Sequence, residues 1–315
     1  MSLLTAMGAT HIPVYRGAGE GICRPPVHAD SIHGKSGLDG TDLLPIPSIK
    51  PLDAPAVDAI ASAILKTKSG TAWIIATGAL TNVAQSFAKY PELATHVKGL
   101  SLMGGAIGDN FSSAVMGKVD DRERIGNWSN WAEFNILVDP EAASHLFSNA
   151  TLNKKIVMIP LDVTHQVLAT KEVQALLLEG KWGEEKSTLR TMLVELLTFF
   201  AQTYSEVFGI TEGPPLHDPL AVAVVLDGVK GVEIPFCDFE AKEGRRERFA
   251  VEIVTDGTHE DALLGAETGR TVAKLLPEGE EGVKIPRCLD TKRFWGVLEE
   301  CLGRADEVNR AKGVE

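Results

Sequence analysis

Strand-like and helix-like hydrophobic patterns alternate along the first two thirds of this chain. Short apolar runs at residues 12–15, 72–77 and 97–103 are typical of strands, whereas residues 57–65 and 80–90 repeat apolar side chains with the period of a helix. Strands that alternate with helices form right-handed βαβ units, whose strands are parallel and whose helices cover the sheet. The sequence therefore predicts an α/β fold with a mainly parallel central sheet and helices on both faces.

The last third of the chain continues with helical patterns and then turns to strand patterns. The helical patterns cover residues 187–208, 217–226 and 291–311, and the strand patterns cover residues 232–239, 248–254 and 283–290. The first two of these strands are candidates for a hairpin, because a charged loop separates them. No linker, repeat or low-complexity segment divides the chain, which predicts one domain over residues 1–315.

Composition excludes several classes of protein. The 315 residues include 31 basic and 43 acidic side chains, which gives a formal net charge of −12. This acidic balance disfavours a nucleic-acid partner, since phosphate binding needs a basic surface. The longest apolar run, residues 220–226, is far shorter than the roughly 20 residues of a membrane helix. The amino terminus lacks the pattern of a signal peptide, so we expect a cytoplasmic protein without a membrane partner.

The cysteines show no metal-binding or redox motif. Cys23, Cys237, Cys288 and Cys301 form no CxxC pair. Because cytoplasmic proteins keep their thiols reduced, we expect free cysteines that are buried for structural reasons.

Two long stretches, residues 17–47 and 104–132, lack a regular pattern. Compact domains rarely keep more than about 15 structureless residues unless these serve a site. In an open α/β sheet, both stretches would follow the carboxyl ends of strands, where ligands bind. The first begins with GAGEGI, which is similar to a dinucleotide-binding loop, but Ile22 replaces the third glycine and two prolines follow where a helix should begin. We therefore interpret this segment as a turn-rich loop.

The segment AEFNILVDPEAA contains two different signals. Asp139 and Pro140 fit an N-cap and a first-turn proline, which together are a structural device. Glu133 and Asn135 flank Phe134 in a period-2 segment, so a strand would place both on one face. A carboxylate beside an amide suits the recognition of hydroxyl groups, because the carboxylate accepts and the amide both donates and accepts.

Two further segments have both a structural and a functional interpretation. In ATGALTN, a strand end, a glycine turn and a capped helix explain the pattern, whereas the functional interpretation exposes the backbone carbonyl of Thr77 to a ligand or metal. In LHDPLA, capping explains Asp218, with Pro219 at the first helical position. Capping explains His217 less well, and a histidine held beside a carboxylate before a helix is a candidate general acid.

Seven motifs follow one another in an order that is typical of one protein family. They are IPVYRGA, IHGKSGLDG, ATGALTNVAQ, SLMGGAIG, GNWSNWAEFNILVDPEAA, IPLDVTHQVLAT and PPLHDPLAVA. Together they resemble the nucleoside hydrolase family, the inosine- and uridine-preferring N-ribohydrolases, over nearly the whole chain. The resemblance implies a homo-oligomeric α/β enzyme of purine and pyrimidine salvage. Such an enzyme binds one calcium ion and uses water to cleave the N-glycosidic bond of a ribonucleoside.

The resemblance also implies roles for individual residues. An oxocarbenium-like transition state needs polar contacts on the sugar, and metal-bound water supplies the nucleophile. The implied residues are the backbone carbonyl of Thr77 and the carboxylate of Asp218 for calcium, Met103, Asn127, Glu133 and Asn135 for the ribose, and the catalytic pair His33 and His217 beside the leaving base.

One motif of the family has no counterpart in this sequence. The family opens with DxDxxxDD, which supplies most calcium carboxylates and the aspartate that activates water, whereas this chain begins with what resembles the following helix, SLLTAMGA. Neither Asp39 with Asp42 nor Asp120 with Asp121 has that spacing or a preceding strand. Because calcium takes about six to eight oxygens, we expect an incomplete calcium site and an impaired hydrolase.

The missing motif also affects the expected fold. It implies an N-terminally incomplete domain in which the family's first strand is missing. The alternative function is that of a non-catalytic relative, which binds a nucleoside weakly or serves as a partner subunit.

Overall fold

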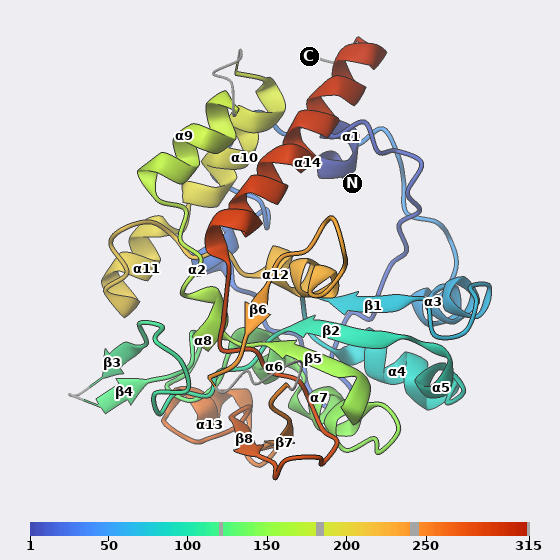
Figure 1. Cartoon of the computed structure of the whole chain (residues 1–315), viewed down its shortest axis with the longest axis vertical. Coiled ribbons are helices and arrows are strands. Elements are labelled where there is room, and N and C mark those ends of the chain that lie inside the picture. The colour runs from blue at the N-terminus through green and yellow to red at the C-terminus, as the bar shows by residue number, and fades with distance from the viewer. Residues whose placement is uncertain (120–121, 181–185, 240–245, 314–315) are drawn as a thin grey trace.

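The computed structural model describes residues 1–119, 122–180, 186–239 and 246–313 (Figure 1). The helices are α1 (Ser2–Ala6), α2 (Asp30–His33), α3 (Ala56–Leu65), α4 (Thr81–Lys89), α5 (Leu93–His96), α6 (Phe134–Val138), α7 (Pro140–Phe147), α8 (Leu161–Thr164), α9 (Lys171–Glu179), α10 (Thr188–Thr198), α11 (Ala201–Phe208), α12 (Asp218–Ala223), α13 (His259–Leu263) and α14 (Thr291–Lys312). The strands are β1 (Trp73–Ala76), β2 (Gly99–Met103), β3 (Gly117–Val119), β4 (Arg122–Arg124), β5 (Ile156–Ile159), β6 (Phe236–Cys237), β7 (Phe249–Ile253), β8 (Thr271–Leu275) and β9 (Cys288–Leu289).

The central sheet has three parallel strands in the order β1-β2-β5. Helices α4 and α5 connect β1 to β2, and α6 and α7 lie between β2 and β5 in the chain. This arrangement confirms the predicted α/β fold. Within the described ranges no strand pairs with the outer edge of β1. The strand predicted at residues 12–15 is wrong: it contributes only an isolated bridge between Tyr15 and Leu52, because Pro13 has no N–H for a ladder.

Helices cover both faces of this sheet (Figure 1). On one face, Leu100 and Leu102 of β2 belong to an apolar cluster that includes side chains of α3, α4, α5 and α7. On the other face, Val157 and Ile159 of β5 belong to a cluster with Leu220 of α12 and with side chains of α14. All five residues of β2 are buried. Burial on both sides explains why the strands have continuous rather than alternating apolar patterns.

The strongest helical patterns lie close to where the sequence predicted them. Helices α3, α4 and α14 match their predicted ranges within about two residues, whereas the stretch 187–208 forms two helices, α10 and α11. The first ends at Thr198, whose hydroxyl donates to the carbonyls of Val194 and Glu195 and competes for the acceptors of the last turn. No helix in the described part of the chain combines the length and apolar character of a membrane span.

The carboxyl-terminal strands pair differently from the prediction. Strand β6 pairs with β9 and β7 pairs with β8, both antiparallel, so residues 232–239 and 248–254 do not form a hairpin. The β6–β9 register places Cys237 opposite Cys288, and a disulfide joins them. The prediction of four free, buried cysteines is therefore wrong. Cys23 and Cys301 are free, and both are exposed.

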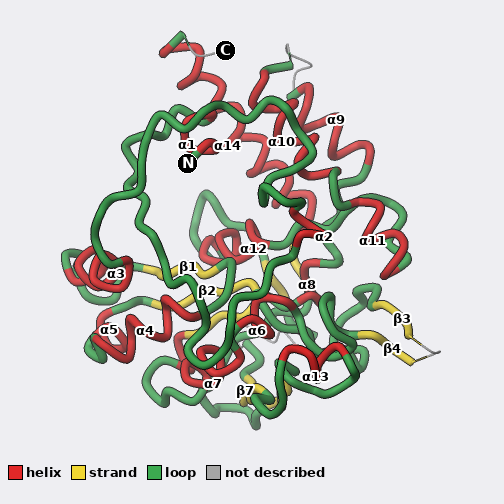
Figure 2. The backbone as a smooth tube through the Cα atoms, turned by 180° about the vertical axis from the view of Figure 1, so that it is seen from behind, coloured by secondary structure: helices red, strands yellow, loops and turns green. Residues whose placement is uncertain are grey.

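The two long irregular stretches remain largely without regular structure. Between α1 and α3 the chain is loop except for the short helix α2 (Figure 2). No helix follows the GAGEGI segment, whose Ala18 and Ile22 N–H groups donate to the side chains of Asn82 and Asp139. The turn-rich interpretation of this segment is confirmed. The second stretch contains the hairpin of β3 and β4, which the sequence did not predict.

Candidate active site

The carboxyl ends of β1 and β2 carry the first members of a polar cluster. Ala76 pairs with Leu102, so Thr77 and Met103 follow at the same level of the sheet. Met103 is buried and Thr77 is exposed. Beyond Met103, the backbone N–H of Gly105 donates to the Glu133 carboxylate at 2.9 Å. The turn after β2 therefore holds a buried carboxylate beside the end of the strand.

Glu133 and Asn135 lie together, but not on a strand. Residues Phe134–Val138 form helix α6, and Glu133 is its N-cap, which accepts from the N–H groups of Asn135 and Ile136. The predicted strand is wrong because the first amides of a helix need acceptors, and Glu133 supplies them. The Asn135 side-chain amide donates to the carbonyl of Met103 at 3.1 Å. Met103, Glu133 and Asn135 thus form one connected group.

Capping explains Asp139 but not Asp218. Asp139 accepts from the N–H of Ala142 and precedes the first-turn proline of α7, as predicted. At α12, in contrast, His217 occupies the N-cap position and Asp218 is the first helical residue, and no side-chain cap is formed. The predicted capping role of Asp218 is therefore wrong. Its carboxylate accepts no hydrogen bond from any residue that the structure describes, so it is available to a ligand.

The cap predicted for α4 is also wrong. Leu80 is its N-cap residue, and it makes no side-chain cap. Thr81 is the first helical residue, and its hydroxyl donates to Asp139 at 2.5 Å. The polar residue at this helix start therefore joins two helices rather than capping its own.

Both ring nitrogens of His217 have protein partners. Nδ1 lies 2.8 Å from Thr164 Oγ1, and Nε2 lies 2.7 Å from the hydroxyl oxygen of Tyr204. The ring of His165 packs beside His217 at a centroid distance of 5.9 Å and stands nearly perpendicular to Tyr204, at 88°. His217 is therefore held in one orientation by α8 and α11.

Sequence reasoning missed Thr164, His165 and Tyr204. Tyr204 lies in the stretch with a helical pattern and is 3% exposed. A buried tyrosine needs a hydrogen-bond partner for its hydroxyl, and this was the one signal available in the sequence. The identity of that partner depends on how α11 packs against the segment before α12, which no local pattern shows.

Asn127 and His33 lie close to this pair. The Asn127 side chain accepts from the N–H of Phe134 at 2.8 Å and hydrogen-bonds to Tyr204. His33 is exposed on α2, and its charge is among the causes that lower the pKa of His217. Both predicted residues are thus near the group that they were expected to join.

Desolvation shifts the pKa of three groups in this cluster. Burial raises the pKa of Glu133 to about 7, against the effect of three backbone N–H donors. The surrounding protein displaces water from the Asp218 carboxylate and raises its pKa to about 6, although the residue as a whole keeps solvent contact. Burial lowers the pKa of His217 to about 3, so its imidazole is neutral at neutral pH. Shifts of this kind are typical of functional sites.

The described residues do not by themselves fit calcium. Among them, no group of three or more His, Cys, Asp and Glu side chains is arranged to hold a metal. The Thr77 carbonyl and Asp218 would give calcium too few of its about six to eight oxygens. Asp39 instead accepts from the backbone of Lys35 and Ser36. Asp42 is exposed in the same loop, and residues 120 and 121 lie outside the described residues.

Known proteins are similar to this chain over most of its length. Residues 1–296 match the family described as inosine-uridine preferring nucleoside hydrolase. The uridine nucleosidase of Saccharomyces cerevisiae is 35% identical over 315 residues, which covers 98% of this chain and 84% of the yeast protein. The pyrimidine-specific ribonucleoside hydrolase RihA of Klebsiella pneumoniae is 34% identical over 72% of this chain, and the match covers 64% of RihA, less than two thirds.

Solved structures share the fold. A plant nucleoside hydrolase, the PpNRh1 enzyme, superposes with a TM-score of 0.71 at 25% identity, over 95% of this chain and 83% of the plant chain. A purine-preferring ribonucleoside hydrolase from Gardnerella vaginalis has a TM-score of 0.68 at 25% identity, over 97% of this chain and 83% of its own. From the match over residues 1–296 and the identity to the yeast protein, this chain belongs to the inosine-uridine preferring nucleoside hydrolase family.

Proposed function

We propose that this chain binds a ribonucleoside at the candidate active site and cleaves its N-glycosidic bond slowly. The observation that carries the proposal is the link between two groups: Met103, Glu133 and Asn135 at the end of β2, and the pair of His217 and Tyr204. The Asn127 side chain provides this link, because it accepts from the N–H of Phe134 and hydrogen-bonds to Tyr204. The uridine nucleosidase and RihA matched above support a ribonucleoside as substrate.

The first group suits the ribose. Glu133 and Asn135 offer acceptors and a donor at the strand end, and Asn127 adds an amide. Ribose hydroxyls both donate and accept, so they match this mixture of groups. Contacts on the sugar also stabilise the oxocarbenium-like transition state of glycosidic cleavage.

The second group suits the leaving base. A departing base gains a proton, and a positioned side chain accelerates that transfer. The Tyr204 hydroxyl lies 2.7 Å from His217 Nε2. Burial raises the pKa of Tyr204, and the charges of Glu133 and Asp218 raise it further. Tyr204 and His217 therefore form one hydrogen-bonded pair on the base side, and the charge of exposed His33 acts on the same imidazole.

Activation of water is the step for which these residues are poorly equipped. Calcium, which the resemblance implies, would supply an activated water, but Thr77 and Asp218 do not complete its site. Loss of a general base typically costs about 10²- to 10⁴-fold in rate. We therefore expect slow turnover by this chain. We also propose that the protein is a cytoplasmic homo-oligomer that acts in nucleoside salvage.

Binding tests the site independently of turnover. Titration calorimetry with ribose and with uridine is expected to show weak binding of both. Asn135→Ala should abolish both signals, because it removes the ribose contact. Tyr204→Phe should weaken uridine about tenfold and leave ribose unchanged, since one hydrogen bond of about 1.4 kcal/mol is lost on the base side. Gln202→Ala, an exposed change on the helix of Tyr204, is the matched control. Unchanged ribose binding by Asn135→Ala would show that the site is assigned wrongly.

An assay of ribose release from inosine and uridine, with and without added calcium, separates slow hydrolysis from its alternative. The incomplete donor set favours the alternative of a nucleoside-binding relative or partner subunit. Slow release above the uncatalysed rate supports the hydrolase, and nucleoside binding without any release supports the alternative. Rapid calcium-dependent release would contradict the expected impairment.

A further inference from the structure

The chain around His33 folds back on itself. We call residues 33–41 the His33 segment. The N–H of Asp39 donates to the carbonyl of His33 at 3.1 Å, and the Asp39 carboxylate accepts from the N–H groups of Lys35 and Ser36 at 3.0 and 3.3 Å. Such local hydrogen bonds of an aspartate hold a turn in shape. A contact that fixes one end of the segment therefore also places His33 at the other end.

The other end of the His33 segment rests on α10. Glu195 and Phe199 lie one turn apart at the end of this helix, so their side chains point to the same side. The Thr41 hydroxyl donates to the Glu195 carboxylate at 2.5 Å. Gly40 lies directly against Phe199, because a Cβ added to Gly40 would be 2.7 Å from the Cβ of Phe199. We call Gly40, Thr41, Glu195 and Phe199 the α10 seat.

The α10 seat has no room for a side chain at position 40. The Cβ of Phe199 is bonded directly to the helix backbone, so it cannot rotate away from an added methyl group. Gly40 also has a φ of +111°, which residues with a side chain rarely adopt. Glycine therefore permits this close approach, and a larger residue would lift the His33 segment off α10.

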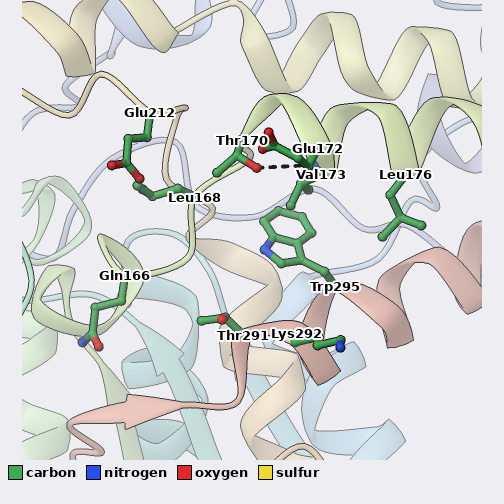
Figure 3. A pocket seen from close by; sticks show the side chains of 10 residues that line it. All are labelled: Gln166, Leu168, Thr170, Glu172, Val173, Leu176, Glu212, Thr291, Lys292 and Trp295. Atoms are coloured by element: carbon green, nitrogen blue, oxygen red, sulfur yellow. Dashed lines mark hydrogen bonds between the residues drawn. The ribbon is translucent and has the colours of Figure 1, made fainter.

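Helix α10 is a fixed support for the segment. Arg190 in its first turn is 5% exposed and donates to the carbonyl of Leu177 in α9 at 2.7 Å and to the carboxylate of Asp306 in α14 at 2.5 Å. Buried polar groups with all their partners make their surroundings rigid. The cavity of about 400 Å³ between α9 and the start of α14 lies apart from this contact, because no residue of α10 lines it (Figure 3). The cavity therefore does not loosen the support.

The same helical stretch carries Tyr204. Helix α11 begins two residues after Phe199, and the Tyr204 ring packs beside Phe200 at a centroid distance of 5.6 Å. The Tyr204 hydroxyl in turn hydrogen-bonds to His217. The His33 segment and the pair of Tyr204 and His217 are therefore placed from one support, α10 and its continuation α11.

We propose that the α10 seat positions His33 for the leaving base. Its four residues touch no substrate themselves, and they set where His33 stands relative to Tyr204 and His217. This inference rests on the proposed function, in which these three residues act on the base side. It requires that the seat matters for a nucleoside and not for ribose alone.

Two glycine variants test this difference. Gly37 in the same segment also has a positive φ, of +80°, but an added Cβ there would meet nothing within 4 Å. Gly40→Ala and Gly37→Ala therefore share the backbone strain, and only Gly40→Ala disturbs the seat. In titration calorimetry, Gly40→Ala should weaken uridine about tenfold and leave ribose unchanged. Gly37→Ala should leave the binding of both ligands unchanged.

Two threonine variants test the seat without any ligand. Thr41→Val removes the hydroxyl that donates to Glu195, whereas Thr41→Ser keeps it. Lys35 is exposed in the His33 segment, and trypsin cleaves after it when the segment opens. We expect Thr41→Val to speed this cleavage about tenfold in the ligand-free chain, because one hydrogen bond is lost. Thr41→Ser should leave the rate unchanged, and mass spectrometry follows the fragments.

The same two variants connect the seat to the base. Thr41→Val should weaken uridine but not ribose, and Thr41→Ser should restore uridine binding. Equal cleavage of the two variants would overturn the seat. Unchanged uridine binding by a rapidly cleaved Thr41→Val, or an equal loss of ribose binding, would overturn its positioning role. Absence of uridine binding by the unchanged chain would contradict the proposed function instead, and the cleavage rates would still decide whether the seat exists.

Discussion

Asp162 and Asp218 are both acidic residues with a raised pKa, but their surroundings give them different tasks. Asp162 is 1% exposed and accepts from the N–H groups of Ile107 and Gly108, each at 2.8 Å. It therefore holds the loop that follows β2. Asp218 has no such donors and remains open to a ligand. The difference lies in which backbone amides each carboxylate meets.

Asp162→Asn should change how stability depends on pH. Burial raises the pKa of Asp162 to about 6 in the folded chain, above its ordinary value of about 3.9. The folded state therefore holds this proton more tightly, and the stability from this group is lost as pH rises from about 4 to about 6. The loss amounts to about 3 kcal/mol. Urea unfolding of the unchanged chain and of Asp162→Asn between pH 4 and pH 7 gives the free energy of unfolding of each. The difference between the two free energies should change by this amount over the pH range, and a difference that stays constant would contradict the prediction.

The pairing of residues 167–169 with residues 214–216 depends on a close approach at Gly213. A Cβ added there would lie 2.3 Å from the carbonyl oxygen of Ala169, which is backbone and cannot turn aside. These two segments join α8 to α12 and so place Thr164 next to His217. A single glycine thus supports the geometry of the candidate active site.

Gly213→Ala should therefore lower the free energy of unfolding by about 3 kcal/mol, as expected for overpacking against backbone. Gly296→Ala is the matched control, because a Cβ at this position in α14 meets nothing within 4 Å. It should instead stabilise the chain by about 0.5–1 kcal/mol through helix propensity. Denaturant unfolding of the two variants measures both effects. A neutral Gly213→Ala would show that the two segments adjust freely.

At the scale of the whole molecule, the strands of the parallel sheet differ in how many strand neighbours they have among the described residues. Strand β2 lies between β1 and β5, whereas the outer edge of β1 has no strand partner in the described ranges. Open edges of this kind pair readily with other chains. The edge of β1 is therefore the part of the parallel sheet where protection from solvent should be weakest.

Native-state hydrogen exchange should show this asymmetry. We expect the outward amides of β1 to exchange roughly a hundredfold faster than those of β2, because they open without unfolding the sheet. Mass spectrometry or NMR after transfer to D₂O measures the rates at increasing protein concentration. Equal protection of both strands in dilute solution would mean that another part of the chain covers the edge, and protection that grows with concentration would identify it as a contact between copies.

The sequence alone determined the parallel α/β architecture and the helices α3, α4 and α14, because the spacing of apolar residues within one segment shows which side chains a helix or strand will bury. It also singled out Glu133, Asn135 and His217, since polar groups at element boundaries are visible in a single segment. Only the tertiary structure decided that Glu133 caps a helix, that Asp218 does not, that Tyr204 pairs with His217 and that Cys237 meets Cys288. The Tyr204–His217 and Cys237–Cys288 contacts join residues 13 and 51 positions apart, and packing rather than local propensity fixes which donor meets which acceptor.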